Sequence, residues 1–392
     1  MSAAFIDWPA KPACFVLINA QHTGVCDTGR ETNAPNLQWK FKTGKGVFSS
    51  PTVVGGVVYI GSLDTNFYAI DAEAGTEKWH VQTGGPIRST AAVVDGTAYV
   101  YSRDGFVYAL NAANGQEFWR CKIAETNQTK SFDDYEYFDS SPALMDQTLY
   151  MGSGDKNLYA IDARTGQVIW KFPVKTKISS PPAVVNGVVY FGVTDGNIYA
   201  VDAASGTNLW KFKTQGNPNN GYPNGDVLHA PVVVDGTVYF GSRDSAVYAL
   251  DTATGKRKWR CPIMGGNNWA ANSPAVCNGT LLIGSSITGA LVAIDTATGK
   301  QKWQLATYKN LAEYSSPAIA DGVAYIGTGD VTVSLAGPAL PKLAPGYLQA
   351  VDLTTHKELW RIMVDGHVWS SPAVVDGSIY FGSLDGYVYA WR

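Results

Sequence analysis

A tryptophan that returns at intervals along the chain constrains this sequence more than any other feature. Its positions are 39, 79, 119, 170, 210, 259, 303 and 360. The residues between consecutive tryptophans keep one order. A proline (Ala91 in one unit) opens an apolar run, and a tyrosine (Leu282 in one unit) follows eight residues later. An aspartate (Asn111 in one unit) stands eight residues before the closing tryptophan. The chain is therefore built from copies of one unit of about 40 residues.

Residues 231–259 show what one unit folds into. The apolar run 232–234 and the β-branched and aromatic run 237–242 flank Asp235-Gly236, a two-residue hairpin signal. A third strand is expected over 246–250 and a fourth over 256–260, after a turn that ends in glycine. Four short strands per repeat predict an all-β fold, an eight-bladed β-propeller of four-stranded antiparallel blades.

The two ends of the repeat array complement each other. The last unit begins at Pro372 and has three strands, whereas residues 37–43 match an isolated fourth strand. We expect residues 37–43 to complete the last blade and close the ring, which removes the open sheet edges. The predicted organisation is a single propeller domain over 37–392, with residues 1–36 as a lead-in segment that packs on the propeller.

The repeat also resembles a known family. The pattern Tyr-Ala-(Ile/Leu/Val)-Asp-Ala-x-(Thr/Ala/Ser)-Gly-x-x-x-Trp is similar to the tryptophan-docking repeat of PQQ-type (quinoprotein alcohol dehydrogenase-like) eight-bladed propellers, over roughly residues 37–392. That family contains PQQ-dependent dehydrogenases and non-catalytic, BamB-like scaffold propellers. The resemblance thus implies the fold and leaves the activity open, because the repeat is structural in both groups.

The resemblance also bears on the cofactor. The dehydrogenases of the family hold the quinone between a tryptophan and a disulfide of two adjacent cysteines, and their calcium binds to carboxylates and an asparagine. The five cysteines of this chain include no adjacent pair. The cofactor is therefore unknown, with PQQ and calcium as one alternative.

Composition excludes several partners. The net charge is −3 and there is no basic run, which argues against nucleic-acid binding. No apolar stretch approaches the ~18 residues of a membrane span. Met1 to Ala20 lacks the basic start and unbroken apolar core of a signal peptide, so the chain as written predicts the cytoplasm. The resembled family is usually periplasmic or secreted, and the compartment stays open. We expect a monomer.

Length variation points to one face of the ring. The turns after the first and third strands of each unit have constant spacing. Extra residues occur in the links from Trp119 to Pro142 and from Trp210 to Pro231, and within the turn Gly327 to Tyr347. These links and the turns after second strands lie on the opposite face in a meander blade. Because scaffolds carry function on loops, we predict that this face is the working face. The alternative is neutral drift of an exposed surface.

The links also provide candidate ligand-binding residues. Two residues before the opening proline most units have serine, whereas His229 and Asn272 break the rule. The position before that one holds Arg88, Asp139 and three aromatic residues, Phe48, Tyr314 and Trp369. These side chains should converge on a funnel at the channel mouth. The predicted ligand-binding residues are Arg88, Asn272, Tyr314, Trp369, Trp269 and His367.

Catalysis and metal binding are more specific roles that some residues of these links could have. Asp139 could act as a base and His229 as a base or metal ligand. An Arg88–Asp139 ion pair and a hydrogen-bonded structural histidine are the alternatives. Three carboxylates in one link, Asp133, Asp134 and Glu136, could bind a hard cation. They lack the spacing of an EF-hand loop, and the alternative there is a solvated loop.

Two functions follow from these observations. The first is a scaffold that presents the insertion-rich face and central funnel to a small polar ligand, a glycan, or a peptide or protein. The second is an enzyme with its active site in the funnel, either a PQQ- and calcium-dependent dehydrogenase or an acid–base enzyme that uses Asp139 and His229. No H-E-x-x-H, G-x-S-x-G or Walker motif is present. The sequence does not decide whether the chain is an enzyme.

Overall fold

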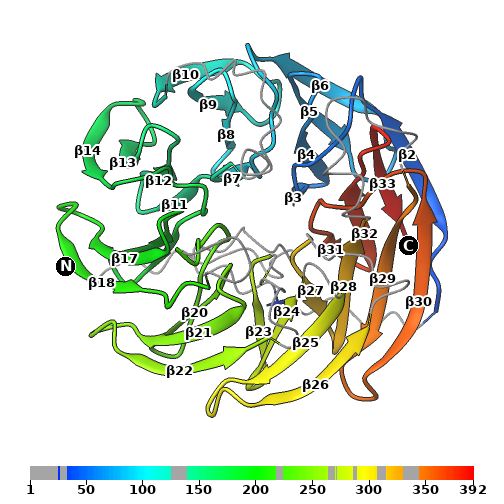
Figure 1. The fold of residues 1–392 in the computed structure, drawn as a ribbon. Coiled ribbons are helices and arrows are strands. Elements are labelled where there is room, and N and C mark those ends of the chain that lie inside the picture. Colours follow the sequence, from blue (N-terminus) through cyan, green and yellow to red (C-terminus); the bar gives the residue numbers. More distant parts are fainter. Residues whose placement is uncertain are drawn as a thin grey trace, which may run out of the picture.

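The computed structural model describes residues 25–26, 33–124, 139–217, 224–263, 270, 272–285, 289–306, 315–329 and 344–392. Its secondary structure over these residues is β-strand, in eight sheets arranged around a central channel (Figure 1). No helix within these ranges is long and apolar enough to cross a membrane. The predicted eight-bladed propeller is therefore confirmed.

The first four blades follow the chain in order, each as an antiparallel meander. Blade 1 contains β3 (Thr52–Val54), β4 (Val57–Gly61), β5 (Asn66–Asp71) and β6 (Glu77–Gln82). Blade 2 contains β7 (Ala92–Val94), β8 (Thr97–Tyr101), β9 (Phe106–Asn111) and β10 (Glu117–Lys122). Blade 3 contains β11 (Ala143–Met145), β12 (Thr148–Gly152), β13 (Asn157–Asp162) and β14 (Val168–Pro173). Blade 4 contains β15 (Ala183–Val185), β16 (Val188–Gly192), β17 (Asn197–Asp202) and β18 (Asn208–Lys213).

The other four blades complete the ring. Blade 5 contains β19 (Val232–Val234), β20 (Thr237–Ser242), β21 (Ala246–Asp251) and β22 (Arg257–Pro262). Blade 6 contains β23 (Ala275–Cys277), β24 (Thr280–Gly284), β25 (Ala290–Asp295) and β26 (Gln301–Ala306). Blade 7 contains β27 (Ala318–Ala320), β28 (Val323–Thr328), β29 (Gly346–Asp352) and β30 (Lys357–Val364). Blade 8 contains β31 (Ala373–Val375), β32 (Ser378–Gly382), β33 (Tyr387–Trp391) and β2 (Leu37–Lys42).

Blade 8 joins the two ends of the propeller, as the sequence predicted. Strand β2 pairs antiparallel with β33, with Lys40 opposite Tyr389 (Figure 1, blue beside red). Two further main-chain hydrogen bonds link Asn36 and Arg392, at 2.7 and 2.9 Å. The last blade is therefore assembled from both ends of the array, and its outer edge is covered by β2.

A short strand from the lead-in segment lies at the channel. Strand β1 (Val25–Cys26) pairs in parallel with β27, with Val25 opposite Ile319. Strand β27 is the first, innermost strand of blade 7 and pairs with β28 on its other side. Residues 25–26 therefore occupy the channel-side edge of blade 7.

Neighbouring blades are locked together by the repeated tryptophan. Trp79 Nε1 donates a hydrogen bond to the Ala112 carbonyl of the next blade at 3.1 Å, and Tyr59 Oη donates to the same oxygen at 2.9 Å. Gly115 has φ of 76° and packs against the Trp79 ring, where an added Cβ would lie 2.8 Å from a ring carbon. Five further indoles donate to the equivalent carbonyl, those of Trp39, Trp119, Trp170, Trp210 and Trp259.

The repeated aspartate forms the turn that receives this tryptophan. Asp71 Oδ1 accepts hydrogen bonds from the main-chain N–H groups of Glu73 (3.1 Å) and Ala74 (2.9 Å). The bond from Ala74 is the main cause of the lowered pKa of Asp71. These aspartates are therefore turn formers, and their carboxylates stabilise the receiving loop.

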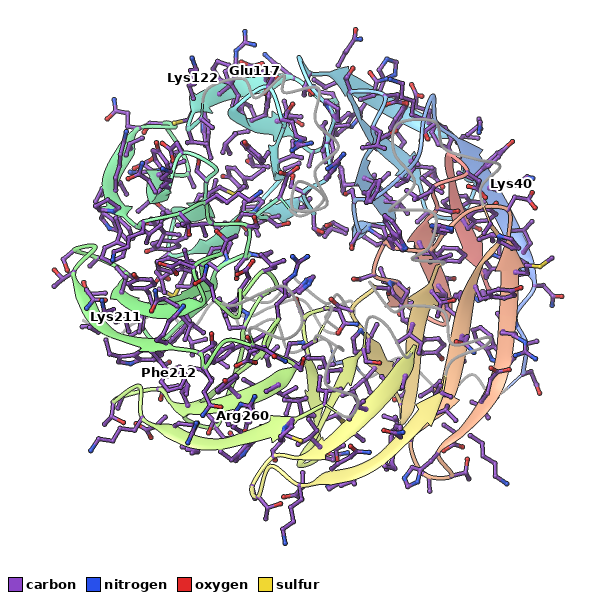
Figure 2. The ribbon with its side chains drawn as sticks, viewed as in Figure 1. Lys40, Glu117, Lys122, Lys211, Phe212 and Arg260 are labelled. Carbon is purple, nitrogen blue, oxygen red and sulfur yellow. The ribbon has the colours of Figure 1, made fainter. Side chains whose placement is uncertain are left out.

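The ring has two faces and an outer rim. We call the face with the β3–β4 and β5–β6 turns and their equivalents in other blades the docking face. The opposite face, with the second-to-third-strand turns and the links between blades, is the link face. Figure 2 shows the labelled Lys40, Glu117 and Lys211 at the outer rim, on the fourth strands β2, β10 and β18. The apolar core lies between adjacent blades as a series of clusters rather than at the centre.

Candidate functional site

The mouth of the channel on the link face is framed by the serines that precede most blades. Ser49 Oγ donates to the carbonyl of Ser89 in the next blade at 2.9 Å. Ser140 and Ser180 repeat this contact to the blades that follow them, at 3.1 and 2.9 Å. The serine pattern in the sequence therefore reflects hydrogen bonds between blades around the channel.

A second set of hydrogen bonds lies one residue further along each link. The main-chain N–H of Ser273 donates to Ser316 Oγ at 3.0 Å, and that of Ser371 donates to Ser50 Oγ at 2.9 Å. Both serine acceptors belong to the next blade of the ring. The frame that positions the side chains of the mouth is thus tied from blade to blade, and a ligand would meet a fixed surface.

Asn272 is part of this frame. Its Nδ2 donates to the Ser315 carbonyl at 2.9 Å, and its Oδ1 accepts from Gly284 N–H at 3.0 Å. Ser140 makes the same two contacts in blade 3, to Ser180 and Gly152. The amide therefore replaces the serine hydroxyl within the frame. The ligand-binding role predicted for Asn272 stays a prediction.

His229 occupies the corresponding position in blade 5. Burial, together with the positive charge of Arg243, lowers the pKa of His229 to about 3. The imidazole is therefore neutral at pH 7 and a weak base. A neutral ring can accept a hydrogen bond, but it gives little driving force for removing a proton from a substrate.

Arg88 and the aromatic side chains form one part of the mouth. The Arg88 guanidinium lies over the Phe48 ring, with Cζ 5.1 Å from the ring centroid. The Phe48 ring meets Trp369 edge to face at 5.2 Å, and Trp369 lies 5.3 Å from the buried ring of His367. The sequence prediction that these link residues gather at the mouth is consistent with these contacts. They provide a cation beside an aromatic surface.

Asp139 belongs to a second part of the mouth, between blades 2 and 3. Its Oδ2 lies 3.4 Å from Arg103 Nε, and both side chains are largely buried, at 15% and 20% exposed. Tyr101 lies close to Asp139. Burial, followed by the negative charge of Asp139, raises the pKa of the Tyr101 phenol. The ion pair of Asp139 thus includes Arg103, whereas Arg88, the partner considered from the sequence, stacks on Phe48.

Sequence reasoning missed Tyr101, Arg103 and Arg243. Tyr101 is the last residue of the second strand of blade 2, ten residues after the opening position. Arg103 and Arg243 follow second strands, twelve residues after the opening position. Seven blades have glycine where blade 2 has Tyr101, at 61, 152, 192, 241, 284, 327 and 382. In other blades, residues of the next link pack against this glycine, as Ile87 does against Gly61. A tyrosine at this position therefore indicates that the next link lies differently in blade 2. At the position of Arg103 and Arg243, the other six blades have leucine, glycine, threonine or serine.

A repeated aspartate of the link face also escaped the sequence analysis. Asp64, in the β4–β5 turn, accepts hydrogen bonds from Gly44 N–H at 2.6 Å and Tyr68 Oη at 2.8 Å. Asp104 does the same in blade 2 with Gly84 and Tyr108, at 2.7 and 2.6 Å. These carboxylates fasten the links to the turns, so they are structural acceptors of the face that carries the candidate site.

Several predicted site residues lie outside the described residues. They are Tyr314, Trp269 and the carboxylates Asp133, Asp134 and Glu136. Among the residues that the structure does describe, no three His, Cys, Asp or Glu side chains are placed to hold a metal ion. Asp139 is paired with an arginine and Asn272 is bonded within the frame. In the described part of the mouth, Asp139 and Asn272 are thus already engaged with other residues of the chain.

The comparisons with known proteins agree with this architecture. Residues 29–137 and 134–268 match the PQQ_2 family model, described as "Outer membrane protein assembly factor BamB". The chain belongs to this family. No match was found among curated proteins.

Solved structures share the fold at low sequence identity. BamB from Moraxella catarrhalis is 17% identical, with a TM-score of 0.72 over 91% of this chain and 99% of that one. Quinohemoprotein alcohol dehydrogenase from Comamonas testosteroni is 14% identical, with a TM-score of 0.75 over 97% and 80%. A europium-containing methanol dehydrogenase is 16% identical, with a TM-score of 0.73 over 94% and 89%. Scaffold-like and dehydrogenase folds are both similar, so these likenesses establish the fold alone.

Proposed function

We propose that this propeller is a scaffold that binds an extended polypeptide at the link face and the channel mouth. One observation carries the proposal. Strand β1 adds to the channel-side edge of β27 as a parallel strand, with Cys26 opposite Ala320. An innermost strand of this ring therefore accepts an extended segment by main-chain pairing, which is a common mode of peptide recognition.

The other blades offer comparable edges. In the described sheets β3, β7, β11, β15, β19, β23 and β31 are terminal strands, each paired on one side. They contact each other around the channel, as β3 does with β7 and β31. Each has three residues, which is too short to template aggregation but long enough to add main-chain bonds to a bound segment.

The side chains of the mouth indicate which peptide would bind. Arg88 supplies a cation beside the aromatic rings of Phe48 and Trp369. Arg103 contributes a second cation, but Asp139 neutralises it. A carboxylate next to an aromatic or aliphatic side chain complements this arrangement, because the guanidinium binds the carboxylate and the rings bury the apolar group. The partner is thus an extended segment with an acidic residue beside an apolar one.

The family supports protein binding and the site gives less support to catalysis. The family model is described as an assembly factor, which is a protein-binding role. The predicted acid–base pair is weakened by the Arg103 contact of Asp139 and by the pKa of about 3 for His229. The second function from the sequence, an enzyme of the funnel, is therefore the alternative that the next experiment must also test.

A peptide selection tests the proposal directly. A random-peptide display library is selected on the immobilised full chain, and the dissociation constants of the selected peptides are measured for wild type, Arg88→Ala and Lys40→Ala. We expect acidic, aromatic-containing peptides whose affinity falls at least about tenfold in Arg88→Ala. Lys40, at the outer rim, is the matched loss of one positive charge and should leave affinity unchanged (Figure 2).

Two results would contradict the proposal. One is a set of peptides whose affinity is the same for wild type and Arg88→Ala but falls in Lys40→Ala. The other is stoichiometric binding of PQQ in the presence of Ca²⁺ together with dye-linked alcohol oxidation, because this would establish the enzyme instead. Titration calorimetry measures the binding of PQQ, and a dye-reduction assay on the same preparation measures the oxidation of alcohols.

A further inference from the structure

Each regular interface between blades contains a buried tyrosine ring. In the slot between blades 1 and 2, the Tyr59 ring lies 5.9 Å from Trp79 at an interplanar angle of 50°. Its hydroxyl donates to the Ala112 carbonyl at 2.9 Å. Tyr99, Tyr150 and Tyr380 donate to the equivalent carbonyls in their interfaces. The repeat therefore builds, slot after slot, a site that holds one phenol ring.

The slot between blades 6 and 7 keeps the repeated tryptophan, Trp303, but lacks the tyrosine ring. Leu282 stands where the other blades have tyrosine, and Leu353 is the residue whose carbonyl corresponds to that of Ala112. His356 stands where other blades have the glycine that packs on the tryptophan, with φ of 57°. Its ring stacks on Trp303 at 4.7 Å and 25°. Leu282 therefore replaces the ring that fills the other slots, and His356 replaces the glycine that packs on the indole.

A cavity opens at this position. It has a volume of about 390 Å³ and is lined by residues of both blades, including Leu282, Trp303, Ile319, Leu353 and His356. Its floor is apolar, because Leu282 and Ile319 are each 1% exposed. Its volume is in the range of sites for small organic ligands. The cavity lies on the docking face, away from the channel mouth.

The rim of the cavity is close to electrically neutral. Lys302 Nζ donates to Thr280 Oγ1 at 2.9 Å and to the Gly279 carbonyl at 3.1 Å, and it lies 3.4 Å from Asp295 Oδ2. The lysine charge is therefore balanced by a carboxylate and engaged with the rim. A neutral ligand suits this site better than an organic anion.

We propose that this slot binds a small para-substituted phenol in the place that tyrosine fills in the other interfaces. The ring would lie between Leu282 and the Trp303 indole, and its hydroxyl would donate to the Leu353 carbonyl. The apolar floor buries the ring, and the carbonyl distinguishes a phenol from a hydrocarbon of the same shape. This site opens on the docking face, although its lining residues Ile319 and Cys277 belong to the innermost strands β27 and β23.

The first test uses Cys277 as a reporter. Cys277 is a partly exposed cysteine without a disulfide that lines the cavity, whereas Cys121 and Cys261 are buried. The rate at which iodoacetamide alkylates Cys277 is followed by peptide mass spectrometry with and without 4-methylphenol. We expect 4-methylphenol to slow the reaction in wild type, with an apparent affinity about fivefold higher than that of toluene. In Leu282→Tyr, which fills the slot, neither compound should change the rate.

Three results would overturn the proposal. They are an unchanged alkylation rate in wild type, equal protection by toluene and 4-methylphenol, and equal protection of Leu282→Tyr. A crystal soaked with 4-iodophenol gives a readout that does not need the variant. The anomalous iodine signal should lie between Leu282 and Trp303, and a signal only elsewhere would also overturn the proposal.

Discussion

The two faces of the ring differ in how closely they follow the repeat. On the docking face, each regular interface has an indole and a phenol that donate to one carbonyl, and a left-handed glycine that packs on the indole, as for Trp79, Tyr59 and Gly115. On the link face, a shared frame of serine hydrogen bonds carries side chains that occur in one blade only, such as Arg88, Asp139 and Tyr101. The regular face holds the blades together, and the irregular face is where a specific ligand can be recognised.

One interface of the docking face breaks the repeat and supports this distinction between the two faces. The slot between blades 6 and 7 is one place where the docking face departs from the repeat, through Leu282 and His356, and a cavity opens there. A break in the repeat therefore marks a candidate site on either face. Positions that keep the repeat are best explained by packing, and those that break it are the first to test for function.

The largest effect should come from removing the strand that closes the ring. A chain that lacks residues 1–42 loses β2, and with it the Trp39 hydrogen bond to the Ala72 carbonyl at 3.0 Å. This leaves the β33 edge open, and we expect insoluble or unfolded protein. A chain that lacks only residues 1–32 keeps β2 and serves as the control. Circular dichroism and gel filtration measure both, and a folded, soluble 43–392 chain would refute closure by β2.

A smaller effect is expected from a pair of glycines in blade 2. Gly115→Ala places a Cβ 2.8 Å from the Trp79 ring in a backbone of φ 76°, so both strain and a clash oppose it. Gly96→Ala has a similar φ of 74° but nothing within 4 Å of the added Cβ. We expect a loss of about 2–4 kcal/mol for Gly115→Ala and about 1 kcal/mol for Gly96→Ala. Equal losses in chemical denaturation would show that the tryptophan contact adds nothing.

The pH dependence of stability tests the environment of His229 on the link face. Its pKa is about 3 in the folded chain, against an ordinary value of 6.5, so the unfolded chain binds an extra proton between these values. Stability is therefore complete above pH 6.5 and falls as the pH drops toward 3, by at most about 1.4 kcal/mol per pH unit. His229→Gln should flatten this part of the curve. The same change at His80, exposed on β6, is the control, and an equal slope in wild type and His229→Gln would contradict the assignment.

The smallest effect compares one ion pair from each face. Arg103 pairs with Asp139 on the link face, with 20% and 15% of the side chains exposed. Arg164 pairs with Asp162 in a docking-face turn and is 70% exposed. Arg103→Met should cost about 1–2 kcal/mol, because it leaves a largely buried carboxylate without this partner, and Arg164→Met should cost much less, because that pair is solvated. Urea unfolding measures both, and a larger loss at Arg164 would reverse the comparison.

The sequence predicted the fold well because its causes are local and repeated. One tryptophan, one tyrosine and one aspartate turn per unit were enough to place eight blades and the closing strand. The candidate site could be predicted only in outline, because its contacts join different links and turns. The sequence placed Arg88 and Trp369 at the mouth, but it could not indicate that Asp139 would pair with Arg103. That contact depends on how the β8–β9 turn faces the next link. Tyr101 was detectable in principle, as the one tyrosine in a column of glycines.

We propose that polypeptide binding belongs to the link face and that the docking face holds the blades together. Hydrogen–deuterium exchange of the full chain, with and without a peptide selected as described above, tests it most directly. With peptide bound, we expect slower exchange in the link segments 46–49, 86–90 and 366–371 and at the innermost strands. Exchange in the docking-face turns 72–76 and 112–116 should be unchanged. Protection confined to the docking-face turns, with the link segments unchanged, would contradict it.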